Sequence, residues 1–147
     1  MSDLHPTPKR EVDQELKGKE WKSALTVAVA GLSAFLSLSG LSIYFLSFGR
    51  VNQFMVLAHT ALGLLFFAPY IIYQIRHYLY SRQFNLSEVK LLGYSSLLVM
   101  AFCVVSGLVL TWQAAMTNRI SYMWDQIHTI SGLVFIPLIV AHILILA

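Results

Sequence analysis

The sequence predicts an all-α fold: an integral membrane four-helix up-and-down bundle. Of its 147 residues, 57% are hydrophobic and only 12% are charged, whereas charged residues make up about a quarter of an average soluble protein. Four stretches of at least 22 residues contain no Asp, Glu, Lys or Arg; they are 23–49, 51–75, 91–118 and 126–147. About 20 apolar residues span a bilayer as a helix, so each stretch is long enough to cross the membrane once.

We expect the four spans near residues 24–48, 53–76, 90–115 and 125–147. A helix satisfies its own backbone hydrogen bonds in lipid, which an open sheet cannot do. The connections between the spans are too short to hold a second domain. The chain is therefore predicted to have two parts, a polar cytoplasmic arm over 1–22 and a four-helix membrane domain over 23–147.

The arm does not have the pattern of a cleavable signal peptide. It contains the polar run His5-Pro6-Thr7-Pro8 and then mixed charges, whereas a signal peptide opens with a short basic stretch followed by an apolar core. We expect a solvated arm, with a turn or two of helix over 11–22 at the membrane surface.

The basic residues are unequally shared between the two sides of the predicted bundle. Eight of the ten Lys and Arg lie in the arm or near the second connection, and only Arg50 and Arg119 lie in the other two connections. By the positive-inside rule, the arm and the loop 77–89 are cytoplasmic, and four spans return the C-terminus to the same side. This predicts a multi-pass protein of the inner (cytoplasmic) membrane. The net charge of +3 then reflects topology, and we expect no nucleic-acid partner.

Four histidines lie in, or at the ends of, the second and fourth spans. These spans run in the same direction, so His59 and His128 are both near the outer face, and His77 and His142 are both nearer the inner face. Positions 14 apart differ by about 40° around a helix, and positions 18 apart by about 0°. Each span therefore presents its two histidines on one face, which predicts two bis-histidine sites stacked across the membrane.

The residue types around these histidines favour haem. An ionisable group inside a bilayer is costly and indicates function by default, although a single His can also hydrogen bond between helices. Zinc and copper sites usually add carboxylate or thiolate ligands, but the four uncharged stretches contain no acidic residue and Cys103 is the only cysteine. Two imidazoles suit the two axial positions of a haem iron. Since C-x-x-C-H is absent, we expect two non-covalent haem b groups.

Small and basic residues extend the predicted sites. Gly93 and Gly107, 14 apart in the third span, fall near the inner and outer histidine levels. They can make room for a macrocycle or allow close helix packing. Among the basic residues, Arg76 and Arg119 are candidates for cofactor binding, with Arg76 and its cytoplasmic neighbours suited to pair with haem propionates.

An internal repeat links the two histidine-bearing spans. Residues 59–66 and 128–135 share the pattern H-T-x-x-G-L-x-F, 69 residues apart, and a proline follows each, Pro69 and Pro137. The pattern suggests two copies of a helical hairpin that face each other.

With these motifs, the chain resembles the di-haem cytochrome b superfamily, over about residues 23–147. This superfamily includes the four-helix bundle of cytochrome b in quinol–cytochrome c reductases. It also includes the membrane cytochrome b subunits of formate dehydrogenases, nickel–iron hydrogenases and thiosulfate reductases. The most specific element is the pair His128 and His142, together with Gly93 and Gly107. The resemblance implies an electron-transfer subunit of a larger respiratory complex, rather than a stand-alone enzyme. Its partners would be other redox subunits, the lipid bilayer and quinone.

The chain departs from this family in its second span. In the reductases the two histidines of this helix are close to 14 apart, whereas here position 14 after His59 is Tyr73 and the second histidine is His77. That places His77 about 6 Å deeper along a straight helix, a difference that tilt or a kink at Pro69 can absorb. The alternative function is a haem-free structural or assembly subunit, whose histidines hydrogen bond between helices. A proton relay or transporter is a third, which the lack of acidic residues in the four uncharged stretches disfavours.

Overall fold

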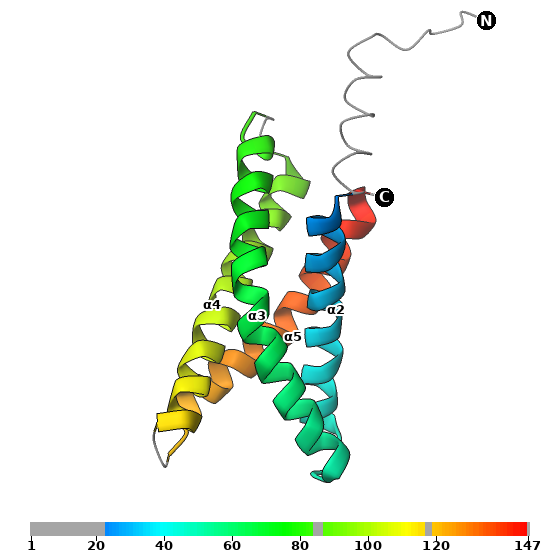
Figure 1. Cartoon of the computed structure of the whole chain (residues 1–147). Helices are drawn as coiled ribbons and strands as arrows, with labels where there is room; N and C mark the ends of the chain where they lie inside the picture. The colour runs from blue at the N-terminus through cyan, green and yellow to red at the C-terminus, as the bar shows by residue number, and fades with distance from the viewer. Residues whose placement is uncertain (1–22, 84–86, 117–118, 147) are drawn as a thin grey trace, which may run out of the picture.

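The computed structural model describes residues 23–83, 87–116 and 119–146, and these residues form four helices and no strand (Figure 1). The helices are α2 (Ala24–Phe45), α3 (Arg50–Ser81), α4 (Glu88–Met116) and α5 (Tyr122–Leu146). Each helix is long and apolar enough to cross a membrane. The predicted all-α four-helix membrane bundle is therefore confirmed. The expected arm over 1–22 lies outside the described residues.

The helix boundaries differ most from the prediction in α3. This helix has 32 residues, begins three residues earlier than expected and continues five residues further, to Ser81. His77 thus lies inside the helix and not at its end. Basic side chains such as Arg76 can extend their charged groups to the membrane surface while their stems stay against apolar surface, so a charge does not have to end the helix. At the same end of the bundle, α2 begins at a cap in which Ser23 Oγ accepts a hydrogen bond from the Thr26 N–H, at 3.2 Å.

The four helices form two antiparallel hairpins, α2–α3 and α4–α5 (Figure 1). Helices α3 and α5 run in the same direction and cross near their middles in this view. Contacts within each hairpin are far more extensive than contacts between the hairpins. The two histidine-bearing helices, α3 and α5, thus belong to different hairpins.

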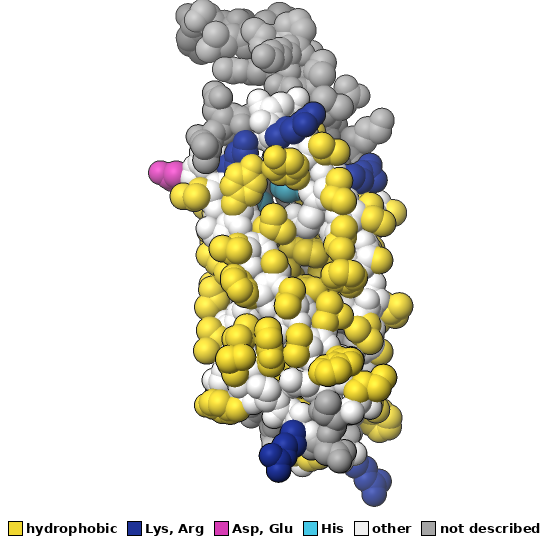
Figure 2. Space-filling view, turned by 90° about the vertical axis from the view of Figure 1, so that its left-hand side faces the viewer, with side chains coloured by type: hydrophobic (Ala, Val, Ile, Leu, Met, Phe, Trp, Pro, Cys, Tyr) yellow, Lys and Arg dark blue, Asp and Glu magenta, His cyan; other side chains and the backbone are white. Residues whose placement is uncertain are grey.

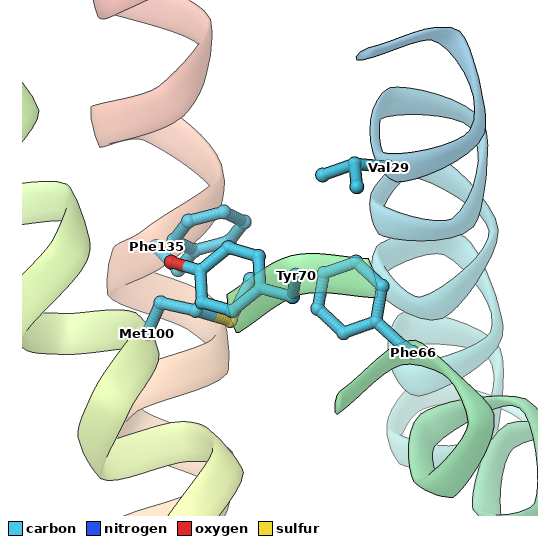
Figure 3. Packing of buried hydrophobic residues seen from close by; sticks show 5 residues of the cluster. All are labelled: Val29, Phe66, Tyr70, Met100 and Phe135. Carbon is cyan, nitrogen blue, oxygen red and sulfur yellow. The ribbon is translucent and has the colours of Figure 1, made fainter. Parts of the chain in front are cut away.

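A cluster of buried apolar side chains joins the hairpins at mid-height, and we call it the waist cluster. It consists of Val29, Phe66, Tyr70, Met100 and Phe135, at least one from each helix (Figure 3). Phe66 is only 2% exposed, and its ring centroid lies 5.0 Å from that of Tyr70. On α5, Phe135 is seven residues, about 10 Å of helix, from the nearest histidine on either side. The waist cluster therefore separates the two histidine levels.

The outer surface of the bundle is apolar. Figure 2 shows hydrophobic side chains covering the side of the molecule, with Lys and Arg side chains only towards its two ends. Among the described residues the basic side chains are Arg76, Arg82 and Lys90 towards one end, and Arg50 and Arg119 at the other. Such a surface suits lipid over the middle of the bundle and polar headgroups at its ends. The chain is thus a multi-pass membrane protein.

Candidate cofactor sites

The structure brings His59 and His128 together across the bundle. Their ring centroids are 6.1 Å apart and their planes are nearly perpendicular, at 86°. His59 lies on α3 and His128 on α5, so each hairpin contributes one ring to this pair, which we call the outer pair. The sequence had predicted these two residues as one site.

The imidazole of His59 is held by α2, its partner within the hairpin. Ser39 Oγ lies 2.8 Å from His59 Nδ1 and also donates its hydroxyl proton to the carbonyl of Leu36, at 3.2 Å. A hydroxyl has a single proton, so in the arrangement in which Ser39 donates to the Leu36 carbonyl it accepts the hydrogen bond from His59, and Nδ1 then carries the ring proton. The next residue, Gly40, lies against the ring, because a Cβ there would stand 3.4 Å from His59 Cε1. In a neutral imidazole of this tautomer, Nε2 keeps its lone pair.

The imidazole of His128 is held in the same way by α4. Its Nδ1 lies 2.9 Å from the carbonyl oxygen of Cys103, and a carbonyl can only accept, so Nδ1 carries the proton here as well. Ser106 Oγ is also close, at 3.3 Å, and donates its own proton to the carbonyl of Phe102, at 2.7 Å. A Cβ on Gly107 would stand 3.0 Å from His128 Cε1. The free lone pair is again on Nε2.

These two binding arrangements form a second repeat, which the sequence analysis missed. Residues 39–41 and 106–108 both read Ser-Gly-Leu, 67 residues apart, and in each the serine and glycine contact the histidine of the same hairpin. The tripeptide is too short to stand out alone. It could have been found by looking one helix before each H-T-x-x-G-L-x-F pattern.

The final residues of those patterns, Phe66 and Phe135, both lie in the waist cluster. The two hairpins therefore match in sequence and in contacts.

The tautomers decide what the outer pair can do chemically. Both Nδ1 protons are committed to protein acceptors, and neither Nε2 has a hydrogen-bond partner among the described residues. Two lone-pair nitrogens cannot hydrogen bond to each other, so the pair is not an interhelical His–His hydrogen bond. Two imidazoles that bind one metal ion from opposite sides, each at about 2.0 Å, hold their centroids roughly 6 Å apart. The observed centroid spacing of 6.1 Å is close to this value.

The second pair of histidines, which we call the inner pair, consists of His77 on α3 and His142 on α5. The electrostatic influence of His77 reaches His142. A Cβ on Gly93 would stand 3.1 Å from His142 Cε1, which repeats the contact of Gly107 with His128. His142 Nδ1 is buried and without a hydrogen-bond partner among the described residues; the backbone of Val89 is near it but not in hydrogen-bond geometry.

The remaining predicted residues fall in two groups. Gly93 and Gly107 lie at the inner and outer levels as expected, but each makes room for an imidazole ring directly. Arg76 and Arg119 are exposed towards opposite ends of the bundle. Within the described ranges, no group of three or more His, Cys, Asp or Glu could hold a metal ion. Both candidate sites therefore rest on two histidines each.

Comparisons of the chain with protein-family models, with curated proteins and with solved structures gave no match. The fold and the two sites define the chain as a membrane-spanning four-helix bundle with paired intramembrane histidines. The resemblance to the di-haem cytochromes b therefore stays a prediction that rests on the sequence of this chain.

Proposed function

We propose that this chain is a membrane-anchored di-haem b-type cytochrome. It transfers electrons across the membrane, between the quinone pool and a partner redox subunit. The observation that carries the proposal is the outer pair: His59 and His128 stand 6.1 Å apart, and both direct their ring protons to protein acceptors. Ligand histidines in metalloproteins almost always donate the second ring N–H in this way.

The set of donors favours haem over a bare metal ion. A tetrahedral zinc ion needs four ligands, and two imidazoles leave it short. Haem supplies four nitrogen ligands itself and needs only the two axial ones. When bound, haem supplies one-electron redox chemistry. The protein residues hold its iron and set its surroundings: His59 and His128 bind, while Ser39 and the Cys103 carbonyl fix the ring orientations.

The inner pair supplies the second site. His128 and His142 are 14 residues apart on α5, which corresponds to about 21 Å along the helix axis. With the waist cluster between them, the two sites stand at separate depths of the bilayer. Two redox centres at two depths give a route for electrons across most of the membrane, which one centre would not give.

The haem-free alternative requires a structural use for the same histidines. An interhelical hydrogen bond between His59 and His128 would need one Nε2–H, and the protons of both rings are placed on Nδ1 by Ser39 and the Cys103 carbonyl. The alternative therefore gives neither Nε2 atom a hydrogen-bond partner among the described residues. Haem iron would satisfy both.

Purification of the full chain with haem spectroscopy tests the proposal. We expect a b-type absorption spectrum, two haems per chain by the pyridine haemochrome assay, and complete release of the pigment by acid–acetone. His59→Ala and His128→Ala should each lose one haem and keep the other, whereas His5→Ala, outside the four predicted spans, should keep both. A colourless protein, or pigment that stays with the polypeptide, would contradict the proposal.

A further inference from the structure

The hairpin repeat breaks at one chemically important position. Fourteen residues after His128 is His142, but fourteen residues after His59 is Tyr73. The α3 histidine of the inner pair comes one helical turn later, as His77. A phenol thus occupies, on α3, the position that corresponds to a histidine on α5.

His77 is also held differently from the other three histidines. A glycine of the neighbouring helix lies against each of His59, His128 and His142. His77 has no such contact with a described glycine, because a Cβ added at any of them would not have His77 among its nearest atoms within 4 Å. Instead, the His77 ring is stacked on Tyr73 of its own helix, with centroids 5.6 Å apart and planes only 10° apart. An aromatic face takes the place of the glycine contact.

Tyr73 is itself well anchored. It is half-buried and packs against the waist cluster. The phenol ring therefore links the packed middle of the bundle to the imidazole of His77. A ring held from one side by the waist cluster can fix the plane of the imidazole stacked on it.

We infer that Tyr73 is the positioning residue of the inner site, and this inference rests on the proposed haem function. Its ring sets the plane of the His77 imidazole, so that a histidine one turn out of the repeat still serves as partner to His142. Tyr73 acts through its aromatic face. A tyrosine can also bind haem iron through its phenol oxygen, so the test must separate the ring from the oxygen.

Three substitutions in the full chain make this separation. Tyr73→Phe keeps the ring and removes the oxygen, and Tyr73→Leu removes the ring. Met55→Leu is the matched control, because Met55 precedes His59 by four residues, as Tyr73 precedes His77. The measurements are the haem count and the low-spin EPR signals, with the signal that His142→Ala removes taken as that of the inner site.

We expect Tyr73→Phe and Met55→Leu to keep two haems and both wild-type signals. Tyr73→Leu should shift the inner signal or reduce it by at least half, while the outer signal remains. The outer signal reports that the variant has folded. The inference is overturned if Tyr73→Leu keeps the inner signal unchanged, or loses both signals together. It is also overturned if Tyr73→Phe loses the inner signal, because the phenol oxygen would then be the functional group. A wild-type chain without haem would instead overturn the proposed function.

Discussion

A Cβ atom on Gly107 would stand 3.0 Å from Cε1 of His128 and 3.3 Å from its Nδ1. Gly107→Ala should therefore push the imidazole away from the Cys103 carbonyl, which accepts its 2.9 Å hydrogen bond. Overpacking of this kind costs about 1–3 kcal/mol. We expect the outer haem to be lost or its low-spin signal to change, while the inner signal stays. EPR spectra and haem counts of the purified variant check this.

The bundle offers a matched control for that substitution. Gly31 lies on α2 and has no atom within 4 Å of the position of an added Cβ. Gly31→Ala should keep both signals and, because alanine favours the helix by about 1 kcal/mol, leave the thermal stability unchanged or slightly higher. Equal haem loss in both variants would mean that the helix, and not the contact with His128, is what the added methyl group disturbs.

Ser39→Ala removes the acceptor of the His59 ring proton. A buried donor left unpaired costs about 1–3 kcal/mol, and loss of such a hydrogen bond to a ligand histidine typically lowers metal affinity 10–100-fold. We expect weaker haem retention at the outer site, measured by transfer of haem to a scavenging apoprotein over time. Ser42→Ala serves as control, because Ser42 donates only to the Leu38 carbonyl at the exposed surface. Equal haem transfer rates in the two variants would count against the tautomer assignment.

The hairpin repeat predicts a rescue at the inner site. His77→Ala should lose the inner haem, as should His142→Ala. Because Tyr73 corresponds to His142 in the repeat, adding Tyr73→His to the His77→Ala variant should restore a second haem with an altered low-spin signal. Haem counts of the single and double variants decide this. If His77→Ala alone keeps both bis-histidine signals, His77 is not a ligand.

The charge distribution predicts the orientation of the bundle. Eight of ten basic residues belong to the arm and the α3–α4 side, so these regions and the end of α5 should face the cytoplasm. An alkaline phosphatase reporter joined after Ala147 should be inactive, and one inserted in the α4–α5 connection should be active. The reverse pattern of activities would invert the topology and exchange the inner and outer pairs.

The fold could be predicted from the sequence because hydrophobic length alone determines a membrane span. The prediction of α3 failed by several residues at its inner end, since Arg76 was taken as a boundary. Helical hydrogen bonding continues past a charge when that charge can reach the membrane surface, and α3 ends only at Ser81. Spans defined by uncharged stretches therefore underestimate helix length.

The candidate sites were predictable only in part. Helical periodicity was sufficient to place Gly93 and Gly107 at the levels of His142 and His128, and the structure puts each against that ring. The role of the Cys103 carbonyl could not be predicted, because backbone acceptors carry no sequence signal. A serine in a membrane helix has many uses, so Ser39 could be recognised only through the Ser-Gly-Leu repeat. The stack of Tyr73 on His77 depends on side-chain rotamers, which periodicity does not determine.

The waist cluster has an electrical consequence. Of its five side chains only Tyr70 carries a polar group, and bound water needs two to four polar partners. These five side chains therefore offer few partners to bound water at the middle of the bundle. In the proposed cytochrome, the current through the bundle would be electronic and would not dissipate the proton gradient. Each electron that moves between the two levels would also cross part of the membrane voltage. A full crossing is worth about 2.3 kcal/mol per 100 mV, so the voltage itself would adjust the balance of electrons between the two sites.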